Sequence, residues 1–149
     1  VKVAGAVLVT TPQDVALADV IKAKTMFDRV DIPVLGVLEN MSVFACPKCG
    51  HETPIFDRGG GARAARALRV PFLGEIPIDP NIRIGGDAGT PVVESHPASA
   101  VAQAFVRVAG VLADRVSVAN LAGKAAAEQG FVPLSALRAS KARGVGGSC

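Results

Sequence analysis

The sequence predicts an α/β fold with a mainly parallel sheet. Two continuous apolar runs, 5–10 and 34–38, have the composition of strands that are covered on both faces. A helical pattern separates them, so the three segments should form a strand, helix, strand unit with a right-handed crossover and parallel strands. At 149 residues, the chain is long enough to bury a core of its own.

The helix of this unit is expected to begin at 11–14. Thr11 would supply the N-cap hydroxyl, Pro12 the first helical position and Asp14 a carboxylate in the first turn. The helix should end before Pro33, because the residue that precedes a proline is pushed away from helical angles.

Further along the chain we expect a short helix over 62–69 and a third strand over 72–76. The segments 77–80 and 85–91 are rich in Gly and Pro, and we expect neither to be helical. Ser99 is expected to cap the last core helix.

Two regions follow from this order: a folded part over 1–118, with a long functional loop at about 39–58, and a loosely attached tail over 119–149, where Ala, Ser and Gly dominate. The chain opens with Val1 and enters an apolar strand within a few residues. We therefore expect it to be part of a larger protein.

Charge and hydropathy argue against several classes of partner. The net charge is +3, and Arg63, Arg66 and Arg69 recur at the spacing of a solvated helix face, so no nucleic-acid partner is indicated. No apolar run approaches the roughly 18–20 residues that cross a bilayer, so we expect no membrane partner. Three cysteines, two of them close together, favour a reducing, cytoplasmic setting over a disulfide framework.

Cys46 and Cys49 are the sharpest chemical feature. Two thiolates three positions apart can point at one metal centre, and soft sulfur ligands favour zinc or iron-sulfur clusters. Such centres usually need four ligands, and the loop supplies two. A two-fold homodimer that places two such loops face to face would supply all four.

Three other interpretations of the pair stay open at this point. It could be a zinc half-knuckle completed by His51, a thioredoxin-like redox pair, or two surface cysteines without a role. Gly50 and Pro54 argue against the redox pair, because they follow the second cysteine where a helix would be needed to lower the thiol pKa. Cys149 is remote in sequence and is expected to be incidental.

Asn40 and the segment 77–79 follow neighbouring strands, at the carboxyl edge where open α/β sheets bind ligands. They could bind a base, although Asn40 alone would suit a turn and Asp79 a helix cap. The glycines at 59–61 could cradle an anion, but close packing beneath the cysteine loop is the favoured role. The motif Gly-x-x-x-x-Gly-Lys-Ser/Thr is absent.

The ordered set of motifs resembles the Mrp/ApbC family of iron-sulfur cluster carriers over about residues 3–113. The motifs are Val-Thr-Thr-Pro-Gln-Asp-Val-Ala-Leu from Val9, Glu-Asn-Met-Ser from Glu39, Cys46-x-x-Cys49, Gly-Gly-Gly from Gly59, Val-Pro-Phe-Leu-Gly-Glu-Ile-Pro from Val70 and Gly-Gly-Asp-Ala-Gly from Gly85.

This resemblance implies a MinD-like P-loop NTPase with a Rossmann-like three-layer fold. It also implies a homodimer that holds a [4Fe-4S] cluster through Cys46 and Cys49 and passes it to apo iron-sulfur proteins. Asn40, Pro77 and Asp79 match positions where this group holds the adenine of ATP.

The same resemblance would place the first strands and the phosphate loop, which binds Mg²⁺ and phosphate, before Val1. We assign no catalytic residue, and we expect this chain alone to be inactive as an ATPase. A zinc-binding interaction domain and a MinD-like positioning ATPase are the alternatives. The second would associate with membranes, for which the sequence offers no terminal basic amphipathic helix.

Overall fold

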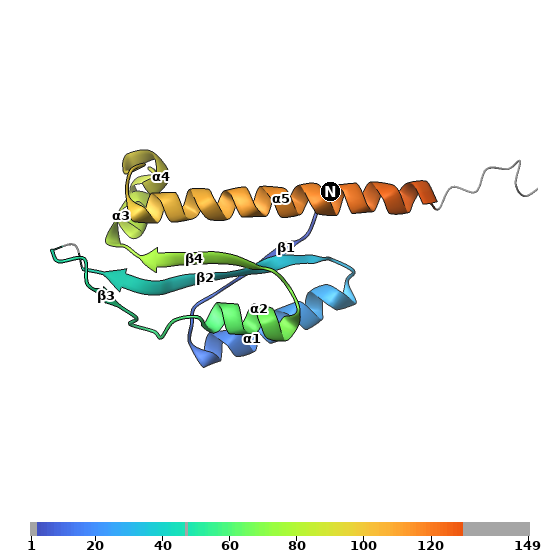
Figure 1. Cartoon of the computed structure of the whole chain (residues 1–149), viewed down its shortest axis with the longest axis horizontal. Coiled ribbons are helices and arrows are strands. Elements are labelled where there is room, and N and C mark those ends of the chain that lie inside the picture. The colour runs from blue at the N-terminus through green and yellow to red at the C-terminus, as the bar shows by residue number, and fades with distance from the viewer. Residues whose placement is uncertain (1–2, 47, 130–149) are drawn as a thin grey trace, which may run out of the picture.

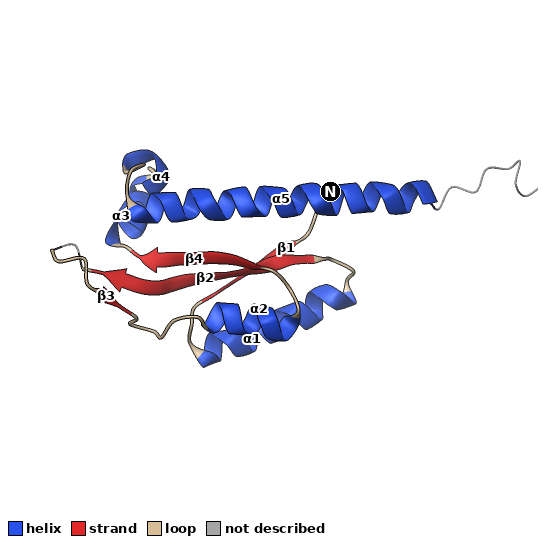
Figure 2. Cartoon of the chain, in the orientation of Figure 1, coloured by secondary structure: helices blue, strands red, loops and turns tan. Residues whose placement is uncertain are grey.

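The structure, a computed structural model, describes residues 3–46 and 48–129, with 122–129 described by their backbone alone. In chain order the elements are β1 (Ala6–Thr10), α1 (Asp14–Arg29), β2 (Val34–Ala45), β3 (Glu52–Thr53), α2 (Gly60–Leu68), β4 (Phe72–Ile78), α3 (Pro80–Ala88), α4 (Val92–Ser95) and α5 (Ala100–Gln129). They form three layers: α1 and α2 cover one face of the sheet, and α5 lies along the other (Figures 1 and 2).

The sheet is centred on β2, which pairs in parallel with both β1 and β4. The short strand β3 returns antiparallel to the end of β2, where Phe44 pairs with Thr53 on one edge and with Ile78 on the other. The predicted mainly parallel sheet is therefore confirmed. Within the described part of the chain, β1 pairs with β2 alone, so its outer edge is open.

Two apolar clusters join the layers. Leu8, Val20, Val37 and Ala65 pack between the sheet and the pair α1 and α2. On the opposite face, a second cluster joins β4, α4 and α5, and its buried members are Ile76, Val92, Val101 and Ala104. Each fully buried Leu, Ile or Val side chain in these clusters contributes about 1.5–3 kcal/mol to folding. The two clusters thus pack β2 and β4 between the helical layers.

Strand β2 is longer than expected. We predicted a strand over 34–38 followed by a loop from Glu39, but the strand continues to Ala45. It can do so because its two buried polar side chains have partners: Glu39 accepts hydrogen bonds from the start of α2, and the Ser42 hydroxyl donates to the Ile76 carbonyl at 3.2 Å. The expected long loop is thus in large part a β-hairpin.

Helix α1 begins at Asp14, later than predicted, and Thr11 does not cap it. The N-cap is Gln13, which makes no side-chain capping bond, and the Thr11 hydroxyl donates to Gln13 Oε1 instead. Packing explains the difference. A Cβ placed on Gly60 would lie 2.4 Å from the Pro12 carbonyl oxygen, so α2 presses closely on this segment and Gln13 is held in an extended conformation.

Helix α3 contradicts the prediction that 85–91 is not helical. Its start combines Asp79 as N-cap, whose Oδ1 accepts from the Asn81 amide at 2.8 Å, with Pro80 at the first position. Its end is Gly89 in the left-handed conformation. The capping interpretation of Asp79 is therefore confirmed.

The last described helix, α5, begins as predicted, since Ser99 Oγ accepts a hydrogen bond from the Ala102 amide at 3.2 Å. The helix runs on to Gln129, so the first part of the expected loose tail is helical. The remainder of that tail, 130–149, lies outside the described residues. No described helix is both long and apolar enough to span a membrane.

Candidate functional site

The cysteine pair lies at the tip of the hairpin formed by β2 and β3. Backbone pairing of Ala45 with Glu52 closes the hairpin, and the Cys46 amide donates to the His51 carbonyl at 2.9 Å. The turn itself is tight, because the Gly50 amide donates back to the Cys46 carbonyl at 2.8 Å. Gly50 adopts a φ of 71°, which glycine reaches at no steric cost.

Both thiols are free, with Cys49 exposed and Cys46 half-buried. The pKa of the Cys46 thiol is lowered, first by a hydrogen bond from the Lys48 backbone amide and then by one from the Cys49 amide. Such amide donors stabilise a thiolate, which is the form that binds metals. The tip therefore holds two soft sulfur groups, and the lowered pKa of Cys46 favours its thiolate form.

Within the part of the chain that the structure describes, the two thiols do not make a complete set of metal ligands. Across the described residues, no group of three or more His, Cys, Asp or Glu side chains gathers at a point where it could hold a metal ion. The structure thus does not place His51 or a carboxylate as a third ligand beside the two thiols. A pair of cysteines can supply half of the ligands of a four-thiolate centre.

The second group of sequence-predicted site residues meets at one cavity of about 320 Å³. It lies beside the carboxyl end of β4 and the start of α3, and its lining comprises Asn40, Met41, Pro77, Ile78, Asp79, Pro80, Ile82 and Arg83. All three predicted base-binding residues are among them. The Asn40 amide carries both a donor and an acceptor, which suits the edge of a nucleobase.

Arg83 lines this cavity and escaped the sequence prediction. Its guanidinium donates to Asp87 at 2.6 Å, one helical turn along α3. Its position, four residues after Asp79, would have drawn attention to it if α3 had been predicted from its Pro start and Gly end.

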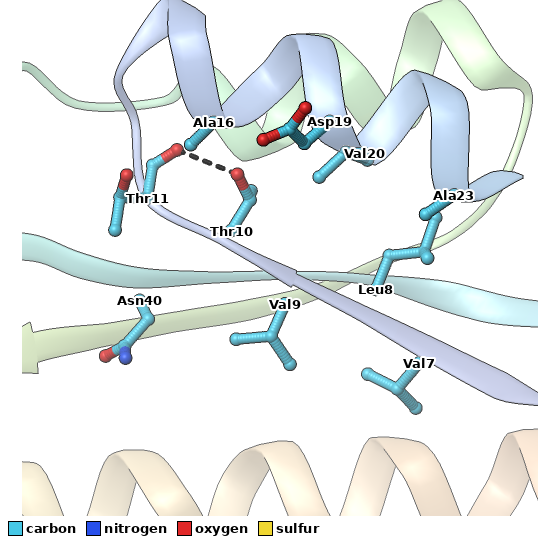
Figure 3. A pocket seen from close by; sticks show the side chains of 10 residues that line it. All are labelled: Val7, Leu8, Val9, Thr10, Thr11, Ala16, Asp19, Val20, Ala23 and Asn40. Atoms are coloured by element: carbon cyan, nitrogen blue, oxygen red, sulfur yellow. Dashed lines mark hydrogen bonds between the residues drawn. The ribbon is translucent and has the colours of Figure 1, made fainter.

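A further cavity, of about 440 Å³, runs along the open edge of β1 (Figure 3). Leu8 and Thr10 point toward α1, whereas Val7 and Val9 point to the opposite side of the strand. Asn40 lines this cavity as well as the previous one. The cysteine hairpin and α3 lie at the same end of the sheet (Figure 1), so both candidate sites belong to one edge of the molecule.

A family model described as the NUBPL iron-transfer P-loop NTPase matches residues 1–113. The chain belongs to this family. Among curated relatives, an iron-sulfur cluster carrier protein of Aquifex aeolicus is 53% identical over 116 residues, which is 78% of this chain and 32% of that protein. The iron-sulfur cluster transfer protein NUBPL of Mus musculus is 45% identical and covers 78% of this chain and 36% of its own length.

Solved structures agree with membership of this NTPase family. A nucleotide-binding protein from Archaeoglobus fulgidus in complex with ADP is 43% identical, with a TM-score of 0.51 over 57% of this chain and 35% of its own. The cell division ATPase MinD of Pyrococcus furiosus is 30% identical, with a TM-score of 0.56, and the match covers 74% of this chain and 42% of the MinD chain. The P-loop NTPase fold class is therefore confirmed. The chain spans about a third of the length of the curated relatives named above.

Proposed function

We propose that this protein is an iron-sulfur cluster carrier that holds its cargo through Cys46 and Cys49. The observation that carries the proposal is the hairpin tip, where a tight turn holds two free thiols and no other described side chain joins them as a third ligand. A homodimer with facing tips supplies four thiolates to one [4Fe-4S] cluster. Ligands at an exposed tip leave the cluster accessible for transfer to apo iron-sulfur proteins.

We further propose that the complete protein binds and hydrolyses ATP with Mg²⁺. The cavity that Asn40, Pro77 and Asp79 share with Arg83 would hold the adenine. Support comes from a 43% identical relative in complex with ADP. The residues of this chain do not include the motif Gly-x-x-x-x-Gly-Lys-Ser/Thr, so we assign them no phosphate or Mg²⁺ contact.

We propose that this function resides in residues 1–118, with 119–149 as an appendage. The family match over residues 1–113 and the layered core support this division. We also propose the cytoplasm as the location, because Cys46 and Cys49 form no disulfide and free thiols persist in reducing compartments.

Anaerobic reconstitution with iron and sulfide tests the proposal against its closest rival, a zinc-binding interaction domain. The full chain is expected to develop the broad brown charge-transfer absorption of an iron-sulfur cluster, and elemental analysis should find iron in preference to zinc. The tight Cys-x-x-Cys turn is also a zinc-knuckle geometry. A colourless protein that retains zinc through the reconstitution would overturn the carrier assignment. Binding to anionic vesicles without a cluster would favour a positioning ATPase instead.

A further inference from the structure

Arg58 joins the cysteine hairpin to the body of the sheet. Its Nη1 donates to Glu52 Oε2 at 3.3 Å, and Glu52 is the first residue of β3, next to the hairpin tip. On its other side the guanidinium binds Glu75 of β4 through two donors, Nη2 at 2.5 Å and Nε at 3.3 Å. One side chain therefore spans from β3 to β4, the strands on either edge of β2.

The backbone of Arg58 is itself fixed. The next residue, Gly59, donates its amide to Glu39 Oε1 at 3.0 Å, and Gly61 donates to Glu39 Oε2 at 2.6 Å. The Glu39 side chain is fully buried in β2. A positioned backbone and a two-donor contact with Glu75 reduce the freedom of a side chain that would otherwise sample many rotamers.

The hairpin has few other attachments. Strand β3 is two residues long, and its pairing consists of Phe44 with Thr53 and Ala45 with Glu52. A strand this short opens readily, because few hydrogen bonds and little apolar burial oppose the opening. A contact from outside the hairpin therefore has a large share in setting its direction.

We propose that Arg58 is a positioning residue for the cysteine pair. By holding Glu52 against Glu75, it sets the direction in which Cys46 and Cys49 leave the sheet. The functional part of this inference rests on the carrier function proposed above, since a cluster shared by two tips requires both tips to face each other. Arg58 touches neither the thiols nor the cargo in this account, and it acts through β3.

Hydrogen exchange of the Cys46 and Gly50 amides in the apo full chain tests whether the contacts of Arg58 with Glu52 and Glu75 restrain the hairpin. Arg58→Gln should accelerate the exchange about 3- to 10-fold, the size expected from partly exposed ion pairs. Arg58→Lys should recover part of the protection, because one donor group cannot satisfy both carboxylates. Arg66→Gln is the matched control, since Arg66 is exposed on α2 and makes no ion pair with any described residue.

A double-mutant cycle then assigns the effect to the pair. Glu52→Gln should accelerate exchange in the wild-type background and add little in the Arg58→Gln background. The difference between wild type and Arg58→Gln should also shrink in about 1 M salt, which screens exposed charges. Equal exchange rates in Arg58→Gln and Arg66→Gln would overturn the restraint by Arg58. So would fully additive effects of Arg58→Gln and Glu52→Gln on the exchange rates.

The functional readout is the rate at which the reconstituted protein loses its cluster to a chelator. Arg58→Gln should lose the cluster about 3- to 10-fold faster, with partial rescue by Arg58→Lys and no change in Arg66→Gln. Faster amide exchange with an unchanged rate of cluster loss would overturn the positioning role. If the wild-type chain takes up no cluster, the carrier proposal fails by itself, and the exchange measurement still decides whether Arg58 holds the hairpin.

Discussion

Cys46→Ser and Cys49→Ser are each expected to abolish the brown absorption of the reconstituted protein almost completely. Each substitution removes two of the four thiolates from a site shared by two chains, and a serine hydroxyl is a harder ligand that stays protonated at neutral pH. Absorption spectra and iron content after anaerobic reconstitution measure the loss.

The controls for this prediction lie in the same chain. Both cysteines are at the hairpin tip and make no core contact that the fold requires, so urea unfolding of the apo variants should match wild type within about 0.5 kcal/mol. Cys149→Ser, remote in sequence, should keep the full absorption. A wild-type spectrum in the Cys46→Ser, Cys49→Ser double variant would remove these residues from the ligand set.

Glu39→Gln is expected to lower the free energy of unfolding by about 2–3 kcal/mol. The two carboxylate oxygens accept from the Gly59 and Gly61 amides inside a fully buried environment. Glutamine keeps one acceptor and turns an NH₂ group toward the other amide, so one buried donor loses its partner. The favourable interaction of the carboxylate with the amino-terminal end of α2 is lost as well.

Urea denaturation of wild type and variant measures this change, with similar slopes expected for both. Glu94→Gln is the control, because Glu94 is exposed on α4 and the substitution should stay within about 0.5 kcal/mol of wild type. A Glu39→Gln variant as stable as the control would mean that the carboxylate does not anchor α2 to β2.

Sequence patterns within single helices and strands were sufficient to predict much of the fold. The continuous apolar runs predicted β1 and the first half of β2, and the serine at position 99 predicted the start of α5. The end of β2 was missed because a buried Glu39 has no local signal: its partners, Gly59 and Gly61, lie 20 and 22 residues away. Such a contact belongs to the tertiary structure.

Helix α3 was missed for a different reason. Gly85 and Gly86 were taken as breakers, although Pro80 and Gly89 are standard start and stop signals. The helix tolerates Gly85 because a Cβ there would lie 2.4 Å from the Thr90 carbonyl oxygen, so close packing with the next segment requires glycine. Without α3, the sequence indicated Asn40, Pro77 and Asp79 but not Arg83.

For the cysteine site, the sequence indicated the two proposed ligands and the fact that two are too few for a four-ligand centre. The hairpin, the amides that lower the Cys46 pKa and the Arg58 contacts all depend on where β3 and β4 lie relative to β2. Spacing alone carries no information about those positions.

The mass and metal content of the reconstituted protein show whether two chains share one cluster. Native mass spectrometry is expected to find a dimer with one [4Fe-4S] cluster, and Cys46→Ser, Cys49→Ser chains should carry none. A monomer that holds a complete cluster would contradict the account, because the two thiols of a single hairpin would then have found their remaining ligands within one chain.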